Sequence, residues 1–99
     1  MTNKEASITK FLERLSGALD PSTWMTVDHW DADLHAIGVA RTGDPTRLVY
    51  VSTWGQEEGQ YAFDCEAPDE SPTKFKVVRR EEAASFDTLL SAISTHLFS

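Results

Sequence analysis

The sequence predicts an α+β fold: a five-stranded antiparallel meander sheet with an N-terminal and a C-terminal helix packed on one face, in the order α-β-β-β-β-β-α. Three observations support this prediction. Apolar residues recur at helical spacing near both termini, β-branched and aromatic residues dominate the region between them, and four short polar breaks divide that region into five segments. Because the chain has 99 residues, we expect one hydrophobic core and one domain over residues 1–99.

Both predicted helices are amphipathic. The first runs from about Asn3 to Leu19 and stops at Asp20-Pro21, because proline disfavours helical backbone in the residue before it. The second runs from about Phe86 to Leu97, with Ser85 as its N-cap. Their apolar stripes consist of Ile8, Phe11, Leu12, Leu15, Ala18 and Leu19 in the first helix and of Phe86, Leu89, Leu90, Ile93 and Leu97 in the second.

Strands are predicted near residues 23–30, 34–41, 47–54, 60–66 and 74–80. The loops between them are short, so consecutive strands pair antiparallel. Alternation of side chains then sets the register. The predicted cross-strand pairs are Met25 with Val39, Val27 with Ile37, Val39 with Val49, Ile37 with Val51, Val51 with Phe63, Val49 with Cys65, Asp64 with Lys76, and Glu66 with Lys74.

This register gives the sheet one continuous apolar face, on which both helix stripes belong. The residues of this inner face are Met25, Val27, Ile37, Val39, Val49, Val51, Tyr61, Phe63, Cys65, Phe75 and Val77. Residues 67–73 and 81–84 are predicted to be loops.

The opposite, outer face is also apolar over its first three strands, where an exposed sheet face normally alternates with polar residues. A contiguous aromatic patch with a charged rim is typical of a protein contact, because Trp and Tyr bring large area at low entropy cost. We therefore predict a partner-binding surface, called here the predicted aromatic surface, for another protein or for a second copy in a homodimer. It consists of Trp24, Trp30, Leu34, Leu48, Tyr50 and Trp54.

Two alternatives remain open for this chain. The outer rings can form a second small core, if the sheet coils over them or a loop covers them. The domain can instead bind a small molecule in a pocket between helices and sheet. A cavity lined by Tyr61, Phe63 and polar groups favours a ligand, whereas solvent-facing Trp24, Trp30 and Trp54 favour a protein partner.

Composition and motifs exclude several other functions. A net charge of −7 and a pI near 4.7 oppose binding to nucleic acid, whose affinity for proteins comes largely from Lys and Arg. The run Lys74 to Arg80 is interpreted as the charged guard of an edge strand. No apolar run approaches the roughly 18 residues of a membrane span, and the charged N-terminus is unlike a signal peptide, so we expect a cytoplasmic protein without membrane contact.

No catalytic, cofactor or metal site is predicted. The single Cys65 points into the core by alternation, where a thiol behaves as a small apolar group. His29 and His35 would be cross-strand neighbours beside several aspartates, but no recognised spacing demands a metal, and a solvated hairpin end explains them. No set of nucleophilic or acid–base groups converges in the sequence, so we expect a non-catalytic domain.

The predicted order of elements resembles the architecture of bacterial secretion chaperones and of immunity proteins that neutralise toxins. The likeness lies in the architecture alone, because no motif matches residue by residue. The helix that secretion chaperones place between their strands is absent from the prediction. What this resemblance implies is an adaptor that binds another protein.

Overall fold

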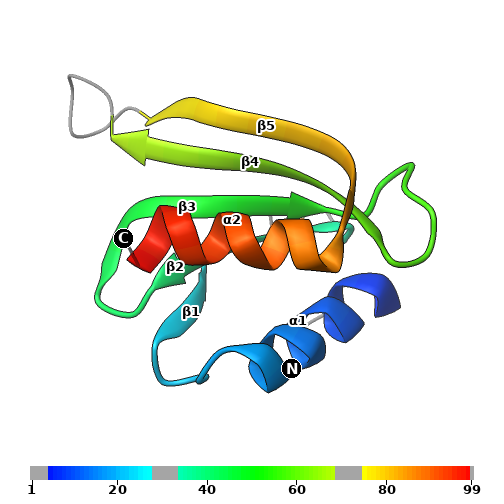
Figure 1. Cartoon of the computed structure of the whole chain (residues 1–99), viewed down its shortest axis with the longest axis horizontal. Coiled ribbons are helices and arrows are strands. Elements are labelled where there is room, and N and C mark those ends of the chain that lie inside the picture. Colours follow the sequence, from blue (N-terminus) through cyan, green and yellow to red (C-terminus); the bar gives the residue numbers. More distant parts are fainter. Residues whose placement is uncertain (1–4, 28–33, 69–74, 99) are drawn as a thin grey trace.

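The computed structural model describes residues 5–27, 34–68 and 75–98 and has two helices and five strands (Figure 1). The elements follow the chain as α1 (Ala6–Ala18), β1 (Trp24–Val27), β2 (Ala36–Arg41), β3 (Asp44–Ser52), β4 (Gln60–Pro68), β5 (Phe75–Ser85) and α2 (Phe86–Phe98). The strands form one open antiparallel sheet in the order β1-β2-β3-β4-β5. The predicted α+β meander is therefore confirmed.

Capping residues account for the starts of both helices, and a proline accounts for the end of α1. Glu5 is the N-cap of α1, and its carboxylate accepts a hydrogen bond from the Ala6 N–H at 2.8 Å. The helix stops at Ala18, just before the proline that the sequence places after Asp20. Ser85 caps α2 as predicted, because its Oγ accepts from the Thr88 N–H at 3.2 Å. The predicted start of α1 at residue 3 lies outside the described residues.

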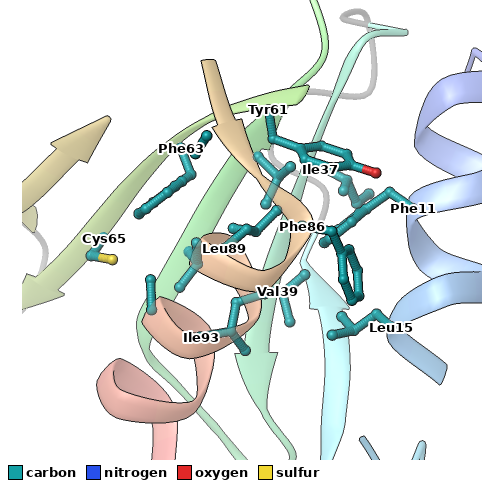
Figure 2. Packing of buried hydrophobic residues seen from close by; sticks show 14 of the residues in the cluster. Phe11, Leu15, Ile37, Val39, Tyr61, Phe63, Cys65, Phe86, Leu89 and Ile93 are labelled. Carbon is teal, nitrogen blue, oxygen red and sulfur yellow. The ribbon is translucent and has the colours of Figure 1, made fainter. Parts of the chain in front are cut away.

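The core lies between the helices and one face of the sheet (Figure 2). Ile8, Phe11 and Leu15 of α1 and Leu89 and Ile93 of α2 belong to a single buried cluster with inner-face residues of the sheet. The inner-face members include Ile37, Val39, Val49, Val51, Tyr61, Phe63 and Cys65. Both helices therefore cover the same face. Among the described residues, no helix is long and apolar enough to cross a membrane.

The central hairpins have the predicted register. Val39 pairs with Val49 and Ile37 with Val51, and across the next hairpin Val51 pairs with Phe63. Val49 also lies opposite Cys65 as predicted. These strands are buried on their inner face, so a slip by one residue would turn every apolar side chain away from the helices.

The first hairpin differs from the prediction by one residue. Thr26, not Met25, lies opposite Val39, and Val27 lies opposite Gly38 rather than Ile37. Trp24 therefore faces the core, where it is 9% exposed, and Met25 and Val27 face the other side and are only half-buried. The physical reason is size: an indole buries far more apolar area than Met or Val, so the register that covers Trp24 is favoured.

The last hairpin is also shifted. Asp64 lies opposite Arg80 instead of Lys76, and Glu66 opposite Val77, with register shifts before Phe63 and after Cys65. The Arg80 guanidinium donates two hydrogen bonds to Asp64, at 2.8 and 3.1 Å, a planar pairing that lysine cannot make.

This shift changes where β5 places its side chains. Phe75 and Val77, predicted in the core, are exposed, and residues 81–84, predicted as a loop, belong to the strand. Ala84 takes the buried position opposite Tyr61 instead. The strand then leads directly into α2, so the placement of the helix and the register of β5 are set together.

Candidate binding surface around Trp54

The structure divides the predicted aromatic surface. Trp24 belongs to the main core, and Leu48 is on the outer face as predicted but is only 1% exposed. Tyr50 lies opposite Gly38 on the outer face and is half-buried, and Trp30 lies outside the described residues. Leu34 and Trp54 are exposed. The six residues therefore do not form one open surface.

The middle of the outer face is buried. Ala36 and Ala40 of β2 are fully buried, and Ser52 of β3 is 8% exposed, although they point away from the main core. The first of the two alternatives, a second small core formed by the outer face, describes this part of the face better than an open contact surface does. At the end of the sheet near Trp54, by contrast, a large ring is exposed.

Trp54 lies in the β3–β4 turn rather than in a strand. Its side chain is 72% exposed, and its ring leans against the His35 ring with centroids 5.3 Å apart at 58°. Its N–H donates to Ser52 Oγ at 3.2 Å, and the preceding Thr53 N–H donates to the His35 carbonyl at 2.9 Å. Gly55 follows with φ of 69°, a left-handed conformation that glycine adopts freely. The exposed indole is thus held on a structured turn.

A cavity of about 490 Å³ opens beside this turn. Its wall joins the start of α1, the start of β2, the β3–β4 turn and the start of β4. The lining residues are Glu5, Ser7, Lys10, His35, Thr53, Gln56, Glu57, Glu58, Gly59, Gln60 and Tyr61. Because His35 lines the cavity and also contacts Trp54, the exposed indole is adjacent to the opening.

Hydrogen bonds tie the walls of the cavity together. Ser7 Oγ of α1 and Thr53 Oγ1 of the turn are 2.7 Å apart, and the Glu5 N–H donates to the Leu34 carbonyl at 2.8 Å. On the far side, Gln56 Oε1 accepts from the Ala83 N–H of β5 at 2.8 Å. Three hydrogen bonds therefore join segments of the wall that are distant in sequence, and a preformed wall lowers the entropy cost of binding.

Tyr61 is the most buried of the residues that line the cavity. Its ring packs against Phe11 at 5.4 Å and Phe86 at 6.4 Å between centroids, and the residue is 6% exposed. Figure 2 shows its hydroxyl pointing toward the side of α1, the helix that supplies one wall of the cavity. This hydroxyl makes no hydrogen bond within the described part of the chain, and because no buried side-chain N or O atom there lacks a partner, it is open to the cavity that Tyr61 lines. A bound group can therefore satisfy it.

The cavity wall is acidic. Glu5, Glu57 and Glu58 contribute three carboxylates and Lys10 one ammonium group, and the structure pairs none of these four in an ion pair within its described part. The Glu5 carboxylate already accepts the hydrogen bond of the first N–H of α1. The charges of the wall therefore sum to about −2 at neutral pH.

Metal and nucleophile chemistry find no support in the described part of the chain. Over residues 5–27, 34–68 and 75–98, no three His, Cys, Asp or Glu side chains are grouped to hold a metal ion, and the hairpin end with His29 lies outside these ranges. Cys65 is buried as predicted, and burial raises the pKa of its thiol, an effect that the nearby Arg79 partly opposes. A buried thiol with a raised pKa is a poor nucleophile.

Sequence reasoning missed the cavity because its wall comes from a turn. Gln56, Glu57 and Glu58 look in sequence like the solvated tip of a hairpin between Gly55 and Gly59. The available signal was Tyr61, an aromatic residue with a polar tip at the end of an inner-face strand. Comparison with protein-family models, with curated proteins and with solved structures gives no match for this chain.

Proposed function

We propose that this chain is a non-catalytic protein-binding domain whose contact surface centres on Trp54. This contact surface, called here the Trp54 surface, consists of Leu34, His35, Trp54 and the adjacent cavity. The observation that supports it is the 72% exposure of an indole that is braced by His35 on an ordered turn. Exposed tryptophans are costly to leave in water, and anchoring rings of this kind dominate the binding energy of protein interfaces.

Charge selects the class of partner. The chain has a net charge of −7, and the cavity beside Trp54 is itself acidic. Two copies brought together at this surface would repel each other, whereas a basic protein surface would be attracted and steered toward it. We therefore propose another protein with a basic contact surface as the partner, in preference to a homodimer.

A small-molecule ligand is the second candidate function. A cavity of about 490 Å³ lies within the size range of small-ligand sites, and Tyr61 lines it as this alternative required. However, Phe63 does not line the cavity, and most of the wall is polar or charged. Small-ligand sites are predominantly apolar. A polar wall therefore suits a polar side chain of a protein partner better than it suits an enclosed organic ligand.

The test compares partner binding by the wild type, Trp54→Ala and a matched control, Phe75→Ala. Phe75 is also an exposed aromatic residue, but it pairs with Pro68 at the other end of β4, roughly 30 Å away along a nine-residue strand. A partner isolated from the native host is purified and its affinity measured by calorimetry. We expect Trp54→Ala to weaken binding by about 30-fold or more and Phe75→Ala to leave it unchanged.

Two results would contradict the proposal. One is a partner that binds Trp54→Ala as tightly as the wild type. The other is an equal loss in both variants, which would place the contact elsewhere. Sedimentation of the isolated chain checks the charge argument, because we expect a monomer at micromolar concentration.

A further inference from the structure

We infer that the cavity beside Trp54 receives an arginine side chain of the partner, an inference that rests on the proposed function and names the group recognised there. Three features of the surface support this inference: the charge of the wall, the hydroxyl of Tyr61 and the position of the exposed indole. Each of these favours a planar, cationic hydrogen-bond donor.

The wall of the cavity attracts a cation. Glu57 and Glu58 are both exposed on the turn and have no ion-pair partner among the described residues, so their charge is available to a bound group. Lys10 is the single cation of the wall, against three carboxylates. A hydrogen bond from a charged donor to a carboxylate is roughly twice as strong as one between neutral groups.

The start of α1 does not turn this cavity into an anion site. A helix N-terminus carries a partial positive charge and free N–H groups, which normally favour a bound anion. Here the protein's own Glu5 carboxylate occupies that position, with its Oε2 accepting from the Ala6 N–H at 2.8 Å. A second anion would meet this carboxylate, so the helix end adds nothing to anion affinity.

Tyr61 provides a hydroxyl that faces the cavity. The residue as a whole is 6% exposed, and Phe11 and Phe86 hold its ring in place. The hydroxyl accepts no hydrogen bond within the described part of the chain, and because no buried side-chain N or O atom there lacks a partner, it is open to the cavity and available to a bound group. Arginine presents five N–H donors in a rigid fork, and one donor can reach this oxygen while others reach the carboxylates.

Trp54 completes the site at its opening. Its ring contacts His35, which lines the cavity, so an inserted arginine would pass close to the indole. Guanidinium groups and their aliphatic stems stack well on indole faces, better than the compact ammonium group of lysine does. The surface thus combines a cation–π platform with an acidic cavity.

The experiment uses N-acetyl-arginine methylamide as the probe, with the citrulline analogue as a neutral probe of nearly the same shape. Binding is followed by ¹H–¹⁵N NMR at the Trp54 indole and at Gly59. We expect saturable shifts with the arginine probe at millimolar concentration, at least tenfold weaker binding of the citrulline probe, and weakening by added salt.

Variants then assign the contacts. Tyr61→Phe keeps the packed ring and removes the hydroxyl, and Glu57→Gln with Glu58→Gln removes two charges from the wall. The charge-matched control is Glu13→Gln with Glu82→Gln, two exposed residues that do not line the cavity. We expect a loss of at least about threefold for Tyr61→Phe and tenfold for the wall variant, with no change in the control. Thermal melts confirm that each variant is folded.

Several outcomes would overturn the inference: no saturable response to the arginine probe, equal responses to both probes, or the same loss in the wall variant and the charge-matched control. If the arginine probe fails while Trp54→Ala still abolishes binding of the partner protein, this inference is wrong and the proposed function stands. If the arginine probe binds while Trp54→Ala leaves partner binding intact, the proposed function is wrong.

Discussion

Replacing Trp24 and Trp54 by alanine, one at a time, should have very different effects on stability. Trp24 is 9% exposed in the core cluster, and its Nε1–H donates to the Leu19 carbonyl at 3.4 Å. Truncating a buried Trp or Phe costs about 3–5 kcal/mol, because apolar contact is lost and a cavity remains. A domain of this size has about 5–15 kcal/mol of stability in total, so Trp24→Ala should remove a large part of it.

Trp54→Ala should cost far less. The side chain is 72% exposed, and its ring packs against the His35 ring with centroids 5.3 Å apart. Loss of an aromatic pair is worth about 0.5–1.5 kcal/mol, and changes at exposed sites lie mostly within about 0.5 kcal/mol. We therefore expect a loss below about 1.5 kcal/mol, less than half that of Trp24→Ala.

Urea titration and thermal melts followed by circular dichroism measure both effects. For a domain near 100 residues, each 1 kcal/mol corresponds to a shift of about 4–8 °C in Tm. Trp24→Ala should therefore lower Tm by at least about 12 °C, and Trp54→Ala by less than half as much as Trp24→Ala does. Equal destabilisation by the two variants would refute the reasoning, because it would place both rings in comparable environments. A Trp24→Ala variant that is as stable as the wild type would contradict the register observed in the first hairpin.

The remaining predictions concern strain, pH and reactivity. Ala83 has a φ of 53°, so Ala83→Gly should raise stability by up to about 1 kcal/mol and Ala83→Val should lower it, both measurable in urea. Hydrogen bonds from the residue two positions later lower the pKa of Asp20 and of Asp44. The two ionised aspartates therefore stabilise the fold above about pH 4, and this contribution is lost as pH falls through their lowered pKa values. Replacing Asp20 and Asp44 by Asn should make the free energy of unfolding depend less steeply on pH in the acid range. Cys65, buried with a raised pKa, should react with a thiol reagent only after unfolding; rapid labelling of the native chain would contradict this.

The central strands were predictable because their sequence allows one register that places the valines of the core on the same face. In β2, β3 and β4, apolar residues alternate with small or polar ones, and one register places Val39, Val49 and Val51 together. Helical spacing with a proline stop located α1, and Ser85 located the start of α2. In these segments local pattern and tertiary packing agree, which is the condition under which sequence reasoning succeeds.

The outer hairpins were not predictable in the same way because competing registers differ by little in pattern. In β1, Met25 and Val27 alternate as well as Trp24 and Thr26 do, and only the larger area of the indole decides between them. In β5, charge pairing was a sound guide, but Asp64 has both Lys76 and Arg80 within possible reach, and the bidentate geometry of Arg80 decides. Both decisions depend on side-chain size and shape, which a binary pattern does not record.

The surroundings of Trp54 bear on which molecules its exposed indole can contact. On the outer face of β2 and β3, Ala36, Ala40 and Leu48 are buried, so little apolar area is left there for nonspecific association. The indole that remains stands on a turn beside carboxylates rather than within a flat sheet face. Under the proposed function, the neighbouring carboxylates would repel other copies of this acidic chain and attract a basic surface, so the same residues would oppose self-association and select the partner.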